Sequence, residues 1–128
     1  MQLRILGIDF GERRIGLATA DDRVPIAVPL DTIVSAGDPV DEIARAVEEQ
    51  GAGTVVFGLP LTLTGAEGPQ AQRVREVAEA LAQRISTPID FQDERLTSAQ
   101  ADRMGGKGSK KDAIAASILL QAYLDSRR

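Results

Sequence analysis

Three acidic residues that lie far apart in the chain have the type and setting that suit chemistry on a phosphate. Asp9 follows the apolar run at residues 3–8, so it stands where a buried strand is expected to end. Glu94 and Asp112 are candidates to complete a set of carboxylates with it. Hard cations such as magnesium prefer oxygen ligands, and such ions assist attack on phosphate. The three positions therefore predict metal-assisted chemistry on a phosphate.

The segment DFGERRIG at residues 9–16 adds groups that suit an anion. Gly11 and Gly16 fit a tight turn between two strands. Arg13 and Arg14 carry guanidinium groups, whose planar fork matches the oxygens of a phosphate. Strand alternation directs only one of the two arginines into the site, and the pattern leaves open which one it is.

Composition narrows the kinds of chemistry that are available. The chain has 128 residues, of which 43% are hydrophobic and 27% charged, as in a globular protein. This length suits one domain and is too short for two lobes that close over a nucleotide. Because there is no cysteine and no histidine, zinc by its usual ligands and nucleophiles activated by histidine are excluded. No stretch resembles a membrane span or a signal peptide, so we expect a cytoplasmic protein.

The net charge of -4 argues mildly against a nucleic-acid partner, yet the basic residues are unevenly placed. All three lysines, Lys107, Lys110 and Lys111, fall in the glycine-rich segment at residues 104–111. One interpretation is a mobile loop that clamps a nucleic-acid backbone. The alternative is an ordinary solvated connection, and the segment alone fits both equally. Because aromatic residues are few, recognition by backbone and shape is favoured over base stacking.

Periodicity predicts three strands in the first third of the chain, at residues 3–10, 14–20 and 26–34. Pro25 and Pro29 indicate an edge or an irregularity in the third strand. A helix then begins with Asp38 as its cap and Pro39 at its first position, and it ends at Gly51. The three strands are expected to form an antiparallel meander.

Strands and helices alternate in the rest of the chain. Strands are predicted at residues 54–57 and 89–92, with a long helix between them that buries a stripe from Val74 to Ile85. Thr97 is expected to cap a short helix that ends at the glycine pair 105–106, and Asp112 to open a final helix to about residue 125. Crossovers through helices imply that these last two strands are parallel. The expected fold is three-layer α/β with a mixed five-stranded sheet.

Ligands of such sheets bind beyond the carboxyl ends of the parallel strands. Asp9, Gly58 and Glu94 all occupy that end of their predicted strands. The segments that carry them should therefore converge at one edge of the sheet, which predicts a single functional site there.

Four segments, taken together and in order, resemble a known family. They are DFGERRIG at 9–16, VFGLPL at 56–61 followed by GAEG at 65–68, DERLT at 93–97, and KDAIAASILLQAYL at 111–124. This set is similar to the YqgF/RuvX family of RNase H-like proteins and spans nearly the whole chain. Two positions depart from the family pattern. Thr62 stands where asparagine is common, which leaves the role of that side chain open, and Arg13 stands where lysine is frequent.

The resemblance implies an RNase H-like fold and a proposed nuclease activity, described as 5′-end maturation of pre-16S ribosomal RNA or as Holliday-junction resolution. It assigns the acidic positions to Asp9, Glu94 and Asp112, which would hold two magnesium or manganese ions, with Asp9 the best candidate to bridge them. A two-fold dimer would suit a resolvase, because a resolvase makes two symmetric cuts. Trimming of RNA requires one site at a time, and RNA is slightly favoured on family grounds.

Each acid also has a purely structural interpretation. Asp9 could make a local turn hydrogen bond, and Asp112 could cap the last helix. Glu94 could form a surface pair with Arg95, and alternation puts Asp93 and Glu94 on opposite faces without choosing between them. The resemblance favours Glu94.

Two other functional classes stay open. A strand, an aspartate and a glycine turn also open the phosphate-binding lobe of actin-like ATPases and sugar kinases, but this chain lacks the second lobe. The other rival is a protein that binds RNA or the ribosome and keeps a nuclease scaffold without cutting. Retention of all three acids counts against this second rival.

Overall fold

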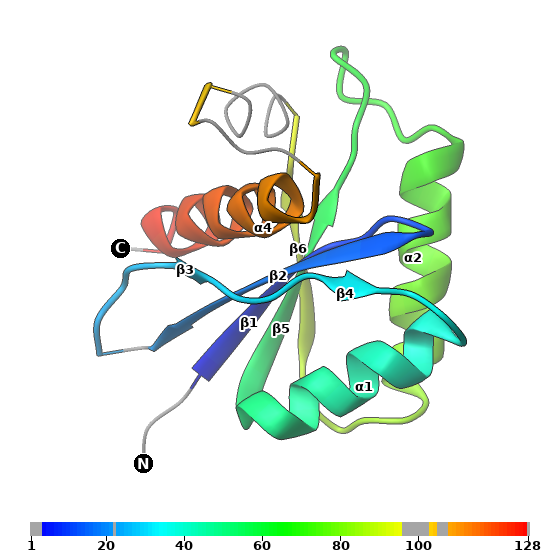
Figure 1. Cartoon of the computed structure of the whole chain (residues 1–128). Helices are drawn as coiled ribbons and strands as arrows, with labels where there is room; N and C mark the ends of the chain where they lie inside the picture. The colour runs from blue at the N-terminus through cyan, green and yellow to red at the C-terminus, as the bar shows by residue number, and fades with distance from the viewer. Residues whose placement is uncertain (1–3, 22, 96–102, 105–107, 128) are drawn as a thin grey trace.

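The protein is described from a computed structural model of the whole chain (Figure 1), in which residues 4–21, 23–95, 103–104 and 108–127 are described. The short helix predicted after Thr97 and the first lysine of the basic segment, Lys107, lie outside these residues. Within the described part, no helix is both long and apolar enough to cross a membrane.

A mixed sheet forms the centre of the molecule. Its strands in the described residues are β1 Arg4–Asp9, β2 Arg14–Asp21, β3 Val28–Pro29, β4 Ile33–Val34, β5 Ala52–Leu59 and β6 Ile89–Asp93. Their order is β3-β2-β1-β5-β6, with β4 paired to β2 beside this path. β2 is antiparallel to β1, β3 and β4, whereas β5 is parallel to β1 and β6 is parallel to β5. The predicted mixed α/β architecture is confirmed.

The third predicted strand differs from the expectation in one respect. Instead of one strand over residues 26–34, two short strands, β3 and β4, pair with separate parts of β2, so the sheet has six strands rather than five. Pro29 ends β3 because proline has no N–H to donate to the ladder. The proline at this position therefore marks a break within the predicted third strand.

The first helix, α1 Pro39–Gln50, has the boundaries that the sequence predicted. The Oδ1 of Asp38 accepts a hydrogen bond of 2.9 Å from the backbone N–H of Val40. Gly51 ends the helix with φ 60°, a left-handed conformation that glycine adopts without a side-chain clash. The second helix, α2 Pro69–Ala82, buries the predicted stripe up to Leu81 and ends before Ile85, which still packs on the core.

The last helix, α4 Gly108–Asp125, begins four residues earlier than predicted. Lys110 and Lys111 belong to its first turn, so the expectation that they lie in a mobile loop is wrong. Lysine is a good helix former, and nothing in the pair prevents the helix from starting before Asp112. Asp112 is therefore inside the helix, and the interpretation of this residue as the helix cap is also wrong.

The helices among the described residues cover the sheet from two sides (Figure 1), with α1 and α2 against one face and α4 against the other. Side chains alternate between the faces along each strand. The large-residue face packs on α1 and α2 and includes Leu6, Ile8, Ile15, Leu17, Val55 and Phe57. The small-residue face packs on α4 and includes Gly7, Gly16, Ala18, Ala20, Val56 and Gly58.

Candidate active site

The carboxyl ends of β1, β5 and β6 meet at one edge of the sheet, as parallel strands must. Asp9 is the last residue of β1 and lies opposite Gly16 of β2, which runs the other way. Glu94 follows β6, and its backbone N–H donates a hydrogen bond of 3.1 Å to the Leu59 carbonyl at the end of β5. The first turns of α4 lie over the same edge, so Asp112 reaches it from the small-residue face.

The carboxyl groups of Asp9 and Glu94 are hydrogen-bonded to each other. Two carboxylates cannot share a hydrogen bond unless one of them carries a proton. Burial, followed by the charge of Asp9 and the shared hydrogen bond, raises the pKa of Glu94 to about 10, so the pair holds one proton at neutral pH. Burial also raises the pKa of Asp9, and the charge of Asp112 raises it further. The pair is a half-buried acidic centre in which negative charge is unfavourable until a cation arrives.

Asp112 forms an ion pair with Arg14, whose Nε lies 2.9 Å from the carboxylate Oδ2. The contact is not aligned as a hydrogen bond, and this buried oxygen accepts none. Burial raises the pKa of Asp112, while the charges of Arg14 and Lys111 lower it. One oxygen of Asp112 therefore keeps unused capacity to accept a donor or a cation.

Three glycines make the approach of these side chains possible. A Cβ on Gly16 would lie 2.0 Å from the Asp112 carbonyl oxygen, so only glycine lets α4 come this close. A Cβ on Gly58 would lie 2.5 Å from Oε2 of Glu94. In the turn between β1 and β2, a Cβ on Gly11 would lie 2.7 Å from the Arg14 carbonyl oxygen. All three glycines of the predicted motif stand where a side chain would displace the site.

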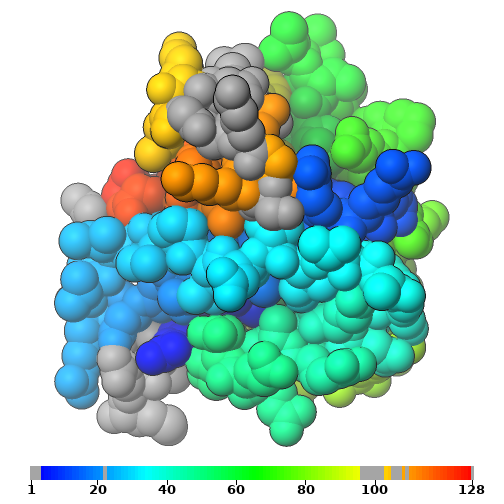
Figure 2. All heavy atoms as spheres, viewed as in Figure 1, coloured from blue at the N-terminus to red at the C-terminus, as the bar shows by residue number. Residues whose placement is uncertain are grey.

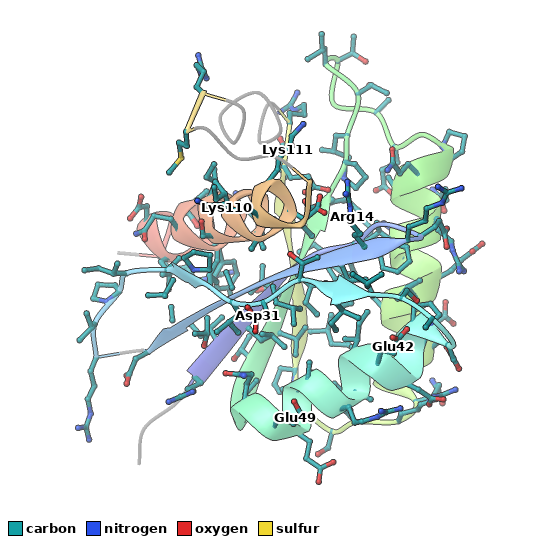
Figure 3. All side chains as sticks on the ribbon, in the orientation of Figure 1. Arg14, Asp31, Glu42, Glu49, Lys110 and Lys111 are labelled. Carbon is teal, nitrogen blue, oxygen red and sulfur yellow. The ribbon has the colours of Figure 1, made fainter. Side chains whose placement is uncertain are left out.

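Some of the predicted basic residues lie next to the acids, and others face the solvent (Figure 3). Arg14 and Lys111 lie at the end of α4 beside the acids, and the charge of Lys111 acts on both Asp9 and Asp112. Arg13 is exposed, and its carbonyl accepts a hydrogen bond of 2.8 Å from Ser35. Lys110 is also exposed and lines a hollow next to the first turn of α4. Of the two arginines, Arg14 is the one that points to the acids.

Glu94, rather than its neighbour Asp93, lies against Asp9. Asp93 is held on the other side of the strand end by Arg95, whose Nε and Nη2 lie 2.8 and 2.7 Å from Oδ2 of Asp93. The surface pair with Arg95 that was considered for Glu94 therefore belongs to Asp93. Strand alternation continues one residue past the end of β6, and this puts Glu94 on the small-residue face.

A short projection next to this edge forms a structural unit that the sequence analysis did not predict. Residues 61–67, here called the finger, begin and end in an antiparallel bridge between Leu61 and Glu67. Thr62, whose role the sequence left open, stabilises the finger: its Oγ1 accepts a hydrogen bond of 3.1 Å from the backbone N–H of Ala66. The Thr-x-Thr-Gly pattern at 62–65 is the turn signal that could have located the finger.

Two hollows of the described surface lie away from the acid pair. One, of about 570 Å³, runs between the β3–β4 connection and the first turns of α4. It shares Leu30, Asp31 and Thr32 with a second hollow over α1. Asp31, Glu42 and Glu49 give this second surface three carboxylates, visible along the front of Figure 3. An acidic surface repels phosphates, so this second hollow, in which the carboxylates outnumber the single arginine Arg45, suits a nucleic-acid backbone less well than the basic end of α4 does.

Comparison with known proteins identifies the family of the chain. The family described as RuvX, Holliday junction resolvase, matches residues 3–126 of the chain. The chain belongs to the RuvX family. A protein of Chloroflexus aggregans named "Putative pre-16S rRNA nuclease" is 48% identical over 97% of this chain and 94% of its own length. One of the same name from Gloeobacter violaceus is 41% identical over 97% of this chain and 85% of its own length. The resemblance stated from the sequence is confirmed.

Solved structures place this RuvX family member among RuvC-like folds. The fowlpox virus resolvase, solved with Holliday junction DNA, aligns with a TM-score of 0.63 at 15% identity over 98% of this chain and 99% of its own. Thermus thermophilus RuvC with a Holliday junction substrate aligns with a TM-score of 0.58 at 17% identity over 98% and 95% of the two chains. At this identity the likeness establishes the fold, and the RNase H-like architecture is confirmed.

The donor atoms at the edge suit a hard divalent cation. All candidate ligands in this RuvX chain are carboxylate oxygens, which magnesium and manganese prefer. The paired carboxyls of Asp9 and Glu94 and the unsatisfied Oδ2 of Asp112 are oxygens whose charge a cation would neutralise. Among the described residues, however, no group of three or more histidine, cysteine, aspartate or glutamate side chains is positioned to hold an ion as it stands.

Proposed function

We propose that this RuvX protein is a single-domain, metal-dependent nuclease that hydrolyses phosphodiester bonds in structured nucleic acid at the edge formed by Asp9, Glu94 and Asp112. The observation that supports it best is the hydrogen-bonded pair of Asp9 and Glu94, with a third carboxylate beside it. Acidic groups are buried together at a cost in stability, and such a cost persists where function requires it. The family match supports nuclease chemistry at this place.

Asp9 would be the ligand shared by two ions, because it contacts Glu94 and also feels the charge of Asp112. Glu94 and Asp112 would complete the set of carboxylate ligands. When bound, two magnesium or manganese ions about 3.5–4 Å apart would activate the attacking water and stabilise the leaving oxygen. Binding of the metal ions would require the pair of Asp9 and Glu94 to release its proton, since a metal ligand must be deprotonated.

Arg14, Lys110 and Lys111 would hold the nucleic-acid backbone. Arg14 is about half exposed while it pairs with Asp112, so a cation that takes over Asp112 would free its guanidinium for a substrate phosphate. Lys111 lies close enough to act on the acids, and Lys110 stands on the solvent side of the same helical turn. Lys107 is proposed to extend this basic end, and Arg13 to contact the backbone farther out.

The substrate proposed first is the 5′ leader of pre-16S ribosomal RNA, because the curated relatives are named for that reaction. Such a reaction would take place in the cytoplasm during ribosome assembly. The alternative is a Holliday junction, which is the substrate in the name of the family and in the complexes of two structural neighbours. A junction resolvase would act as a homodimer so that two symmetric cuts are made.

The decisive experiment offers both substrates to the purified protein. A labelled precursor with the 5′ leader and a labelled four-way DNA junction are incubated side by side with magnesium or manganese. Asp9→Asn is expected to lower the cleavage rate at least about 100-fold, as when other groups that act on transition-state charge are removed. The matched control Asp31→Asn, an exposed acid outside the site, should cut like the wild type.

Each outcome of this comparison has a definite meaning. If the wild type and Asp9→Asn cut alike, the activity comes from a contaminant and the proposal fails. If neither cuts, the protein is better described as one that binds RNA or the ribosome. Cutting by the wild type that depends on Asp9 supports the proposal, and the preferred substrate then separates RNA maturation from junction resolution.

A further inference from the structure

The finger at residues 61–67 is a rigid hairpin although no regular strand forms it. The backbone N–H of Gly65 donates 2.8 Å to the carbonyl of Thr62, which closes a four-residue turn. The N–H of Thr62 donates 2.9 Å to the carbonyl of Ala66 across the finger, and Gly65 has φ 89°, where glycine is favoured. Leu63 therefore occupies a fixed corner at the tip of the turn.

Contacts on both sides fix the finger to the rest of the protein. At its base, the carboxylate of Glu67 accepts hydrogen bonds of 2.6 and 2.8 Å from the Nε and Nη2 of Arg75 on α2. Near its tip, the Nη1 of Arg95 donates 3.2 Å to the carbonyl of Leu63. Figures 1 and 2 show the finger in green, projecting beyond the carboxyl end of the sheet. The finger begins two residues after Leu59, whose carbonyl accepts the backbone N–H of Glu94, so its base lies at the same edge of the sheet as the acids.

The finger presents the side chain of Leu63 to the solvent. Its side chain is 80% exposed, more than that of any other large hydrophobic residue described. A single exposed leucine needs no explanation by itself. Here the residue is at the corner of a turn that is held on two sides and projects from the same edge of the sheet as the acids. A braced apolar tip at that edge suits contact with the face of a nucleobase.

We propose that Leu63 is a wedge that packs against the base next to the cleaved phosphate and directs the enzyme to places where base stacking is already interrupted. The inference rests on the proposed nuclease function and adds a determinant of specificity. Leucine is among the apolar residues that enter base steps in other nucleic-acid complexes. Because opening an intact stack costs free energy, a wedge favours helix ends, branch points and loop boundaries over continuous duplex.

The rigid support of the finger determines how well the wedge works. A flexible tip would lose conformational entropy on insertion, whereas this turn is already ordered by its own hydrogen bonds and by Arg95. Arg95 therefore acts as a positioning residue, with Asp93 holding its guanidinium in place. The chemistry required of the partner is the same in RNA and in DNA: an accessible base face beside a helix end.

Fluorescence of 2-aminopurine tests the wedge directly. The base analogue is placed beside the branch point of a four-way DNA junction in one arm, and at the helix–loop boundary of an RNA stem in the other. Calcium replaces magnesium so that binding is followed without cleavage. Wild type should raise the fluorescence in at least one arm, since unstacked 2-aminopurine is brighter, and the arm that responds identifies the nucleic acid. Leu63→Ala should abolish the rise, and Leu63→Met, which keeps an apolar tip, should retain it.

Cleavage gives the second measurement, with Val34→Ala as the matched control because Val34 is an apolar side chain 66% exposed on β4. Leu63→Ala should lower the preference for the interrupted substrate over continuous duplex about tenfold, while Val34→Ala leaves it unchanged. Melting temperatures of the variants should match that of the wild type, since neither side chain is buried.

The outcomes separate the wedge from the nuclease function. If cleavage depends on Asp9 but Leu63→Ala changes neither fluorescence nor preference, the wedge is overturned and the nuclease stands. If nothing is cleaved while the fluorescence rise depends on Leu63, the nuclease proposal fails and the wedge remains as a feature of binding. Absence of any fluorescence rise with the wild type on both substrates also overturns the wedge.

Discussion

The two faces of the sheet are formed by the same strands, but one mainly provides stability and the other positions the acidic residues. The large-residue face buries branched and aromatic side chains against α1 and α2. The small-residue face carries glycine and alanine where α4 lies, and a Cβ on Gly7 would come within 2.9 Å of Leu120 on that helix. Burial of large apolar side chains supplies most of the stability of a fold. The small residues contribute less area, but they let a helix backbone approach the strands that carry the acids.

This contrast shows how a small domain can hold carboxylates together. Asp9 and Glu94 both lie on the small-residue face, at the point where α4 brings Asp112. Burial of their carboxyl groups opposes folding, so packing on the opposite face must supply the compensating stability. Substitutions on the large-residue face should therefore affect mainly stability, and those on the small-residue face should affect the site first.

The strongest test deletes the same side chain on each face. Leu81 on α2 and Leu119 on α4 are both fully buried, and Leu119 contacts the position of Gly58 beneath Glu94. Each change to alanine should lower the free energy of unfolding by about 2–5 kcal/mol, measured by urea denaturation. Only Leu119→Ala should also lower the cleavage rate at a temperature where both variants are folded. Equal rates for the two would contradict the division between the faces.

Gly16→Ala should have the next largest effect. The added Cβ would overlap the Asp112 carbonyl, so α4 must move away from β2. We expect a loss of about 1–3 kcal/mol in unfolding free energy, the usual range for overpacking, together with loss of most cleavage activity. Gly37→Ala is the control, because nothing lies within 4 Å of the added Cβ there. A Gly16→Ala variant with wild-type activity would show that the close approach of α4 is not needed.

The smallest expected effect concerns pH. The pKa of Glu94 is raised from 4.5 to about 10 in the folded protein. Between those values the folded state binds more protons than the unfolded state, so stability is greatest below the lower value and falls as pH rises through the window. Glu94→Gln removes this dependence and should be the more stable protein by on the order of 1 kcal/mol near pH 8.

Thermal denaturation of both proteins at several pH values measures the difference between them. Magnesium should flatten the slope of the wild type alone, because the cation stabilises the ionised carboxylates. Parallel pH curves for Glu94→Gln and the wild type would show that the pair does not share a proton.

Features encoded by neighbours in sequence were predicted well. The cap at Asp38 and the stop at Gly51 define α1 because each depends on hydrogen bonds within a few residues. The capping signal of Asp112 does not locate the start of α4, because the helix propensity of the lysines before it extends the helix toward its N-terminus. The division of the third strand at Pro29 was signalled, but where pairing resumes depends on β2, which the segment itself does not contain.

The sequence by itself determined the alternation of large and small residues, the ends of α1, and the oxygen-only chemistry of the candidate ligands. Only the tertiary structure decided that Glu94 and not Asp93 meets Asp9, that Arg14 and not Arg13 pairs with Asp112, and that Leu63 stands on a braced finger at the same edge of the sheet. The physical reason is the distance along the chain over which each kind of signal acts. Periodicity and capping act within a few residues, whereas the meeting of distant side chains depends on strand order, register and the closeness of a helix, which are set by the packing of the whole chain.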